Sequence, residues 1–149
     1  MSQIQYLQIV LFAAAAAIAF GLFTTNKILN LSKGSKKMVE ISGAIQEGAK
    51  AYLDRQYTTI AIVGAVIFFA FFLIPFKHTY DVPVGFLIGA VLSGLAGYIG
   101  MNVSVRANVI TAQASSSSLK QGLYVAFNAG AVTGLLVVGL ALAGIAGYF

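Results

Sequence analysis

The sequence predicts an all-α membrane protein with about four transmembrane helices and an additional amphipathic helix on the cytoplasmic side. Three observations lead to this prediction. Hydrophobic residues make up 59% of the 149 residues and charged residues only 9%, whereas a soluble domain carries roughly 25% charged residues. A chain so poor in charge cannot cover a surface that faces water, so lipid is the solvent that fits it. The apolar residues also fall into four long runs.

These runs are the expected spans, at about residues 6–25, 58–76, 82–105 and 123–149. At a rise of about 1.5 Å per residue, each can cross a hydrocarbon core of about 30 Å. None has a charged residue in its middle, and the runs are too few and too long for a membrane β-barrel. We expect the first span to be retained rather than cleaved as a signal peptide, because residues 1–5 contain no Lys or Arg.

The basic residues between the runs predict the orientation. Connection 24–57 holds six of the nine Lys and Arg residues, 77–81 holds one and 106–122 holds two. Because Lys and Arg are enriched in cytoplasmic loops, connections 24–57 and 106–122 are expected in the cytoplasm and the N-terminus outside the cell membrane. The same clustering accounts for the net charge of +5, so no nucleic-acid partner is expected.

Residues 36–56 of the first connection are expected to form the amphipathic cytoplasmic helix, which runs into the second span. Its charged residues recur at helical spacing; they are Lys36, Glu40, Glu47, Lys50 and Asp54. Its apolar residues fall mainly on another face; they are Met38, Ile41, Ile45, Ala49, Tyr52 and Leu53. Oppositely charged neighbours three or four apart would add about 0.2–0.5 kcal/mol per pair. The alternative is an interfacial helix that lies on the lipid headgroups.

The sequence offers few groups for chemistry. It has no cysteine and one histidine, His78, which excludes thiolate sites and multi-histidine metal sites. All four acids lie in connections, and Glu47 and Asp54 are typical of a solvated helix face rather than of a magnesium site. Asn128 is expected to form an interhelical hydrogen bond. We therefore expect no catalytic, cofactor-binding or metal-binding residue in this segment.

Small residues repeat every four positions on three of the predicted spans. The stripes are Ala13, Ala17 and Gly21; Gly85, Gly89, Ser93 and Gly97; Gly130 and Gly134; and Gly139, Ala143 and Gly147. Because lipid gives no hydrophobic drive for helices to associate, their packing depends on close backbone approach. The stripes therefore predict a packed bundle. The serine run 115–118 is expected to be a solvated helix end or loop.

Several strings of residues identify a family. They are GAIQEGAKAYLDRQY at 43–57, GLAGYIGM at 94–101, SVRANV at 104–109, and VAF at 125–127 with GAV at 130–132. In this order and spacing, the chain resembles the membrane-bound, ion-translocating inorganic pyrophosphatases over nearly its whole length. Two local departures leave the subgroup open: Ile110 stands where the family has Arg, and the serine run replaces a more alanine-rich stretch.

The resemblance implies a large homodimeric pump that hydrolyses pyrophosphate with Mg²⁺ at a cytoplasmic site, with K⁺ as a further candidate cofactor. It also implies export of H⁺, or of Na⁺ in some members, and an N-terminus outside. The acidic substrate motifs of this family belong to later helices. Residues 1–149 are therefore expected to be one transmembrane segment, the N-terminal scaffold of a longer multi-pass protein. The alternative is a non-catalytic four-helix membrane scaffold or accessory subunit. A rotor-like proton carrier is disfavoured, because no carboxylate lies at a membrane midplane.

Overall fold

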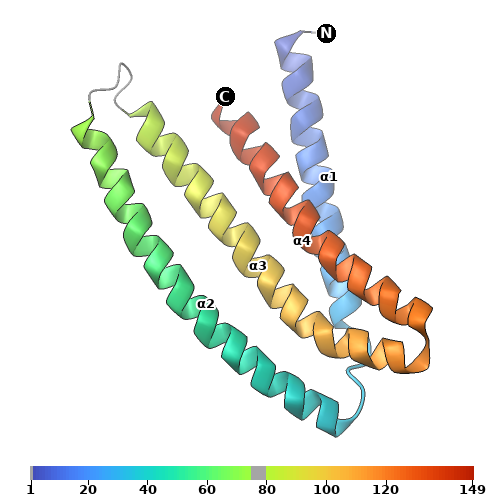
Figure 1. The fold of residues 1–149 in the computed structure, drawn as a ribbon. Coiled ribbons are helices and arrows are strands. Elements are labelled where there is room, and N and C mark those ends of the chain that lie inside the picture. The colour runs from blue at the N-terminus through green and yellow to red at the C-terminus, as the bar shows by residue number, and fades with distance from the viewer. Residues whose placement is uncertain (1, 75–79) are drawn as a thin grey trace.

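The computed structural model describes residues 2–74 and 80–149, and its regular elements are all helical (Figure 1). These elements are α1 (Gln3–Leu29), α2 (Lys36–Ala70), the short 3₁₀ helix η1 (Phe71–Leu73), α3 (Asp81–Ser117) and α4 (Leu119–Tyr148). Four helices, α2 being extended by η1, are long and apolar enough to cross a membrane. The prediction of an all-α chain with about four candidate spans is confirmed.

The helices run alternately in opposite directions. Both termini and the start of α3 lie at one end of the molecule, and the α1–α2 connection and the α3–α4 turn lie at the other (Figure 1). α4 packs against both α3 and α1, whereas α2 contacts α3 alone among the other long helices. α4 is therefore the centre of the arrangement and α2 its outermost helix.

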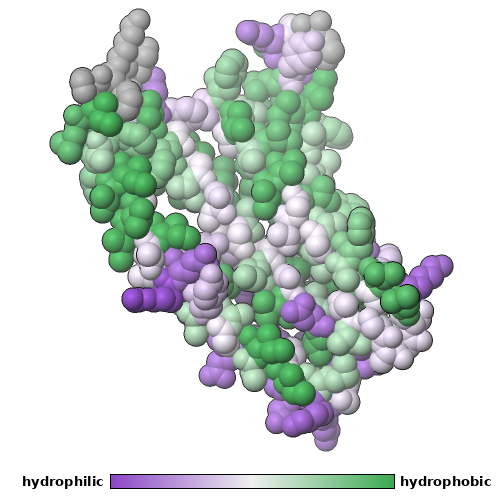
Figure 2. Space-filling view, in the orientation of Figure 1, coloured by the Kyte–Doolittle hydropathy of each residue, from purple (hydrophilic) through white to green (hydrophobic). Residues whose placement is uncertain are grey.

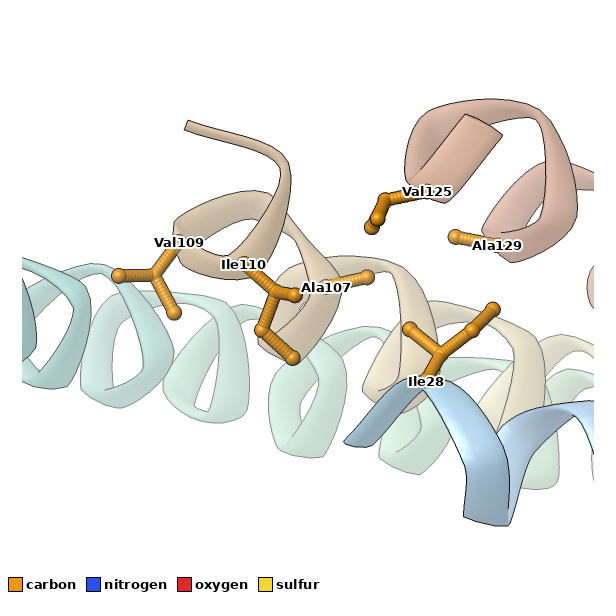
Figure 3. Packing of buried hydrophobic residues seen from close by; sticks show 6 residues of the cluster. All are labelled: Ile28, Ala107, Val109, Ile110, Val125 and Ala129. Carbon is orange, nitrogen blue, oxygen red and sulfur yellow. The ribbon is translucent and has the colours of Figure 1, made fainter. Parts of the chain in front are cut away.

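Buried side chains form two clusters along α4. The first lies towards the end with the α3–α4 turn, and Figure 3 shows Ile28 of α1 reaching towards α3 and α4. Ile28 and Ile110 are each only 1% exposed, and they pack with Ala107, Val125 and Ala129. The second cluster consists of Val103, Val132 and Leu136. These clusters join α1, α3 and α4 into one body.

The amphipathic segment 36–56 is helical and runs into the second span, as expected, but it is the first part of α2 and not an additional helix. Ile41, Ile45 and Tyr52, which belong to its apolar set, are 52%, 51% and 59% exposed, and Leu53 is buried. No glycine with a left-handed backbone interrupts α2. Thr58 and Thr59 donate hydrogen bonds to main-chain carbonyls one turn earlier, where such bonds favour bending of a helix. α2 is bowed in Figure 1.

The ion pairs expected on α2 also differ. Glu40 pairs with Lys37 at 3.3 Å, and both side chains are well exposed. Within residues 2–74 and 80–149, no salt bridge joins Lys36 to Glu40, or Lys50 to Glu47 or Asp54. An exposed pair gains little Coulomb energy and loses side-chain entropy. The continuity of α2 therefore does not depend on the expected ion pairs.

The connection between α1 and α2 is shaped by Gly34 and Ser35. Gly34 has a φ of +80°, a left-handed conformation that glycine adopts without steric cost. A methyl group there would lie 2.7 Å from Sδ of Met38 and 3.1 Å from Cδ of Gln113. Ser35 then caps α2, because its hydroxyl accepts a hydrogen bond from the main-chain N–H of Met38 at 3.3 Å. The connection is thus held against α3.

The predicted connection 106–122 is mostly helix. α3 continues to Ser117, and Ser118 is the extended residue before α4 begins. Of the two forms expected for the serine run, a helix end or a loop, the structure has the helix end, and the hydroxyl of Ser116 donates to the carbonyl of Gln113 at 2.7 Å. The turn is tight, because a methyl group at Gly122 would lie 2.9 Å from Cβ and 3.0 Å from Cα of Ser115.

Gly122→Ala should lower the free energy of unfolding by about 1–3 kcal/mol, because the added methyl group overpacks the turn against the Ser115 backbone. The measurement is the midpoint of thermal unfolding in detergent micelles, followed by circular dichroism. The matched control is Gly130→Ala on the same helix, where a methyl group has no neighbour within 4 Å. The control should leave the midpoint unchanged or raise it, since alanine favours helix. Equal midpoints for the two variants would contradict the packing of the turn.

Candidate functional site

The acidic residues of the described chain are dispersed. Glu40, Glu47 and Asp54 are exposed on α2, and Asp81 begins α3 at the opposite end of the molecule. Within residues 2–74 and 80–149, no group of three or more His, Cys, Asp or Glu residues could hold a metal ion. His78 lies outside the described residues. The donor set here does not fit a magnesium site, and it remains a prediction that the metal ligands belong to other parts of the protein.

Asn128 does not form the interhelical hydrogen bond that was expected. Its Nδ2 donates to the main-chain carbonyl of Tyr124 at 2.7 Å, one turn earlier in α4. A short carboxamide on a helix can reach the carbonyl four residues back, and this local bond satisfies it without a neighbouring helix. Interhelical polar contacts come from other side chains: the Tyr57 hydroxyl donates to the carbonyl of Gly94 at 2.9 Å, and the Tyr148 hydroxyl donates to the carbonyl of Asp81.

Some of the predicted small-residue stripes do form helix contacts. At the crossing of α1 and α4, a methyl group on Gly139 would lie 2.9 Å from Cγ1 of Ile18 and 3.1 Å from the main-chain oxygen of Ala14. A methyl group on Gly21 would lie 3.1 Å from Cγ of Leu136. Glycine is therefore what allows the two backbones to approach so closely.

Other members of the stripes face open space. A methyl group added at Gly89, Gly130, Gly134 or Gly147 would have no neighbour within 4 Å. The helices also leave hollows between them: one of about 610 Å³, which Gly89 lines, lies between α3 and α4, and one of about 940 Å³ lies between α2 and α3. The space-filling view shows hydrophobic surface over the part of the molecule towards the termini and hydrophilic residues at the opposite end (Figure 2). These apolar faces are available to lipid or to further helices.

Tyr57 joins two of the family strings. It ends the string at 43–57, and its hydroxyl donates a hydrogen bond to the carbonyl of Gly94, the first residue of the string at 94–101. Its ring meets that of Tyr98 edge to face, with 5.7 Å between centroids. A methyl group on Gly97 would lie 2.6 Å from the Tyr57 hydroxyl. The strings therefore form one helix–helix contact, with Tyr57 at its centre.

The string SVRANV alternates between core and surface. Ala107 and Val109 are buried, whereas Arg106 and Asn108 are exposed. Ile110, which departs from the family pattern, lies in the first cluster at 1% exposure. A buried isoleucine suits this position because its neighbours are the aliphatic residues Ile28 and Val125.

Four long apolar helices with dispersed acids define the class as a multi-pass helical membrane protein. Residues 15–149 match the family model described as inorganic H⁺ pyrophosphatase. The chain belongs to this family.

Three relatives with similar sequences are named as pyrophosphate-energized pumps. It is 47% identical over 133 residues to a K(+)-insensitive pyrophosphate-energized proton pump of Methanosarcina mazei, and the match covers 89% of this chain and 20% of the relative. A second such pump, of Moorella thermoacetica, is 44% identical, with 89% and 19% covered. A relative from Bacteroides thetaiotaomicron, named for a K(+)-stimulated pyrophosphate-energized sodium pump, is 39% identical, with 87% and 18% covered. The chain thus spans about a fifth of the length of these relatives.

Tyr57→Phe should lower the free energy of unfolding by about 0.5–1.5 kcal/mol, because it removes the hydrogen bond to Gly94 and keeps the ring. Tyr57→Ala should cost more, because the contact with Tyr98 is lost as well. The control is Tyr52→Phe on the same helix, whose side chain is 59% exposed. Thermal midpoints in detergent micelles report the differences. If Tyr57→Phe behaved like Tyr52→Phe, the contact between the two strings would carry no energy.

Proposed function

We propose that these 149 residues are the N-terminal scaffold part of a membrane pump that couples hydrolysis of inorganic pyrophosphate to translocation of H⁺ or Na⁺. The observation that supports this most is the family match over residues 15–149, combined with coverage of only about 20% of the proton pump from Methanosarcina mazei. A pump of that length has room for the reacting groups outside the matched part.

The dispersed acids support the scaffold role. Hydrolysis of a phosphoanhydride assisted by Mg²⁺ needs clustered oxygen ligands, and the described residues bring no such cluster together. No charged residue lies within the described parts of the apolar runs 6–25, 58–76, 82–105 and 123–149, where an ion pathway would need one. Mg²⁺, pyrophosphate and the transported ion would therefore be held by the remainder of the pump.

The open faces support association with further helices. The most apolar window of α2 has no buried residue, and that of α3 has 11% of its residues buried. Small residues such as Gly89 and Gly130 leave room for another backbone. In the proposal, part of this surface packs against other helices of the same pump, which assembles as a homodimer, and the rest faces the bilayer.

The orientation in this proposal has the N-terminus outside and connections 24–57 and 106–122 in the cytoplasm. The fold supports it, because the α1–α2 connection and the α3–α4 turn lie at the same end (Figure 1). This end gathers Lys27, Lys33, Lys36, Lys37 and Lys120, as the positive-inside rule requires of a cytoplasmic face. The first part of α2 would then be an amphipathic extension of the second span into the cytoplasm.

The relatives differ in ion and in K⁺ response. Their names describe K(+)-insensitive proton pumps and a K(+)-stimulated sodium pump. We propose that the residues deciding these properties lie outside the segment described here. K⁺ therefore remains a candidate cofactor of the parent pump.

Orientation can be tested with single cysteines, because the natural chain has none. Lys36→Cys should react with a membrane-impermeant maleimide only from the cytoplasmic side, and Ser2→Cys only from outside. Sealed right-side-out and inverted vesicles give the two accessibilities. The opposite pattern would overturn the proposed topology, and labelling of both positions from one side would contradict α1 as a membrane span.

A complementation experiment tests the function. The Methanosarcina mazei pump lacking the 133 residues that match this chain is coexpressed with the 149-residue chain. Mg²⁺-dependent pyrophosphate hydrolysis and vesicle acidification should return only when both parts are present. The Tyr57→Ala variant should restore less activity than Tyr52→Phe. Hydrolysis by the 149-residue chain alone would contradict the scaffold role, and a failure of the two parts to copurify would favour a separate accessory subunit.

A further inference from the structure

A hollow of about 620 Å³ opens between the ends of α1, α3 and α4, beside the α3–α4 turn. Its walls are of two kinds. Leu31, Ile110 and Val125 give it an apolar part, and Gln113, Lys120 and Tyr124 give it polar groups. The volume falls in the range of pockets that hold small molecules. A ligand for this hollow must therefore combine apolar and polar surface.

The charge at the hollow is positive. Lys120 lines it, and Nζ of Lys27 lies 3.2 Å from the hydroxyl of Tyr124, which also lines it. The same ammonium group lies 5.8 Å from the centre of the Tyr124 ring. A lysine has three donors, so Lys27 keeps two for another acceptor besides Tyr124. No described lining residue is acidic.

The acids of the described chain lie elsewhere. Glu40, Glu47 and Asp54 belong to α2, which contributes no residue to the walls, and Asp81 lies at the opposite end of the molecule. Glu40 is paired with Lys37. The main-chain N–H groups that begin α4 are not capped by the Ser118 side chain, but the final carbonyls of α3 lie beside them. The two helix ends offset each other, so the lysines determine the charge.

The hollow also lies at the expected edge of the bilayer. Lys27 follows the predicted span 6–25, and Tyr124 is among the first residues of the predicted span 123–149. Lysine and tyrosine at the ends of spans are typical of the depth where hydrocarbon meets headgroups. Basic pockets between transmembrane helices at this depth are suited to anionic headgroups.

We propose that this hollow binds an anionic phospholipid, with the lipid phosphate between Lys27 and Lys120 and the glycerol and upper acyl chain against Leu31 and Ala114, above the buried Ile110 and Val125. Gln113 and Tyr124 would supply neutral hydrogen-bonding groups to the headgroup. The apolar walls favour a lipid over free phosphate, which has no surface to bury there. This inference goes beyond the proposed pump function, because it requires neither pyrophosphate nor the remainder of the pump.

The test is native mass spectrometry of the 149-residue chain in detergent micelles, titrated with phosphatidylglycerol or with phosphatidylcholine of the same acyl chains. Phosphatidylglycerol should be retained preferentially. Lys27→Gln and Lys120→Gln should each weaken its binding about fivefold, as expected for one lysine near an anionic headgroup. The matched control is Lys50→Gln on α2, which lies outside the hollow and should leave the affinity unchanged.

Four outcomes would overturn the proposal. They are equal retention of the two lipids, an equal loss in the Lys50→Gln control, loss of binding in Lys120→Arg (which keeps the charge), and displacement of the lipid by millimolar inorganic phosphate. The last would assign a simple anion site instead. Circular dichroism of every variant verifies that its helix content is unchanged. A variant that unfolds is replaced by the corresponding lysine-to-methionine substitution, for which the same weakening is expected.

Discussion

Close approach of helix backbones at glycine is the interaction on which this arrangement depends. In lipid, helices gain little from burying apolar side chains against each other, so association requires tight packing. α4 provides such contacts on two sides. Gly139 lies against the backbone of α1, and Gly122 lies against the end of α3. Between them Val132 is fully buried, at 0% exposure. Because both neighbours are held through α4, this helix sets the positions of α1 and α3.

α2 is attached to the other helices along one side only, which leaves most of its surface open. Tyr57 and a few aliphatic residues join it to α3 alone. Its charged first half and its apolar second half are otherwise open. A helix held along a single seam can present most of its surface to other parts of a larger protein. The family string at 43–57 contributes both to the contact with α3 and to the open surface of α2. Tyr57 packs against α3, whereas Glu47, Lys50 and Asp54 stay exposed.

The two ends of the molecule are chemically distinct. The end with the α3–α4 turn carries most of the lysines, the tight turn and the first buried cluster. Towards the termini the helices separate and leave apolar hollows between them. This asymmetry suits a scaffold whose polar end is ordered by its own contacts and whose apolar part packs against lipid or further helices. Membership of the inorganic H⁺ pyrophosphatase family, with about a fifth of the relatives' length, agrees with such a role.

Composition and apolar run length were sufficient to predict the class and the four helices, because these depend on local pattern, and the family followed from the resemblance of particular strings such as that at 43–57. They could not predict that α3 continues through the third connection as far as Ser117. Nor could they decide which small residues meet a neighbour. Gly139 and Gly130 look alike in sequence, yet only Gly139 lies at a helix crossing. The same holds for Tyr57, whose partner is 37 residues away, and for the hollow beside Lys120. Contacts between distant residues depend on how the helices cross, which only the tertiary structure decides.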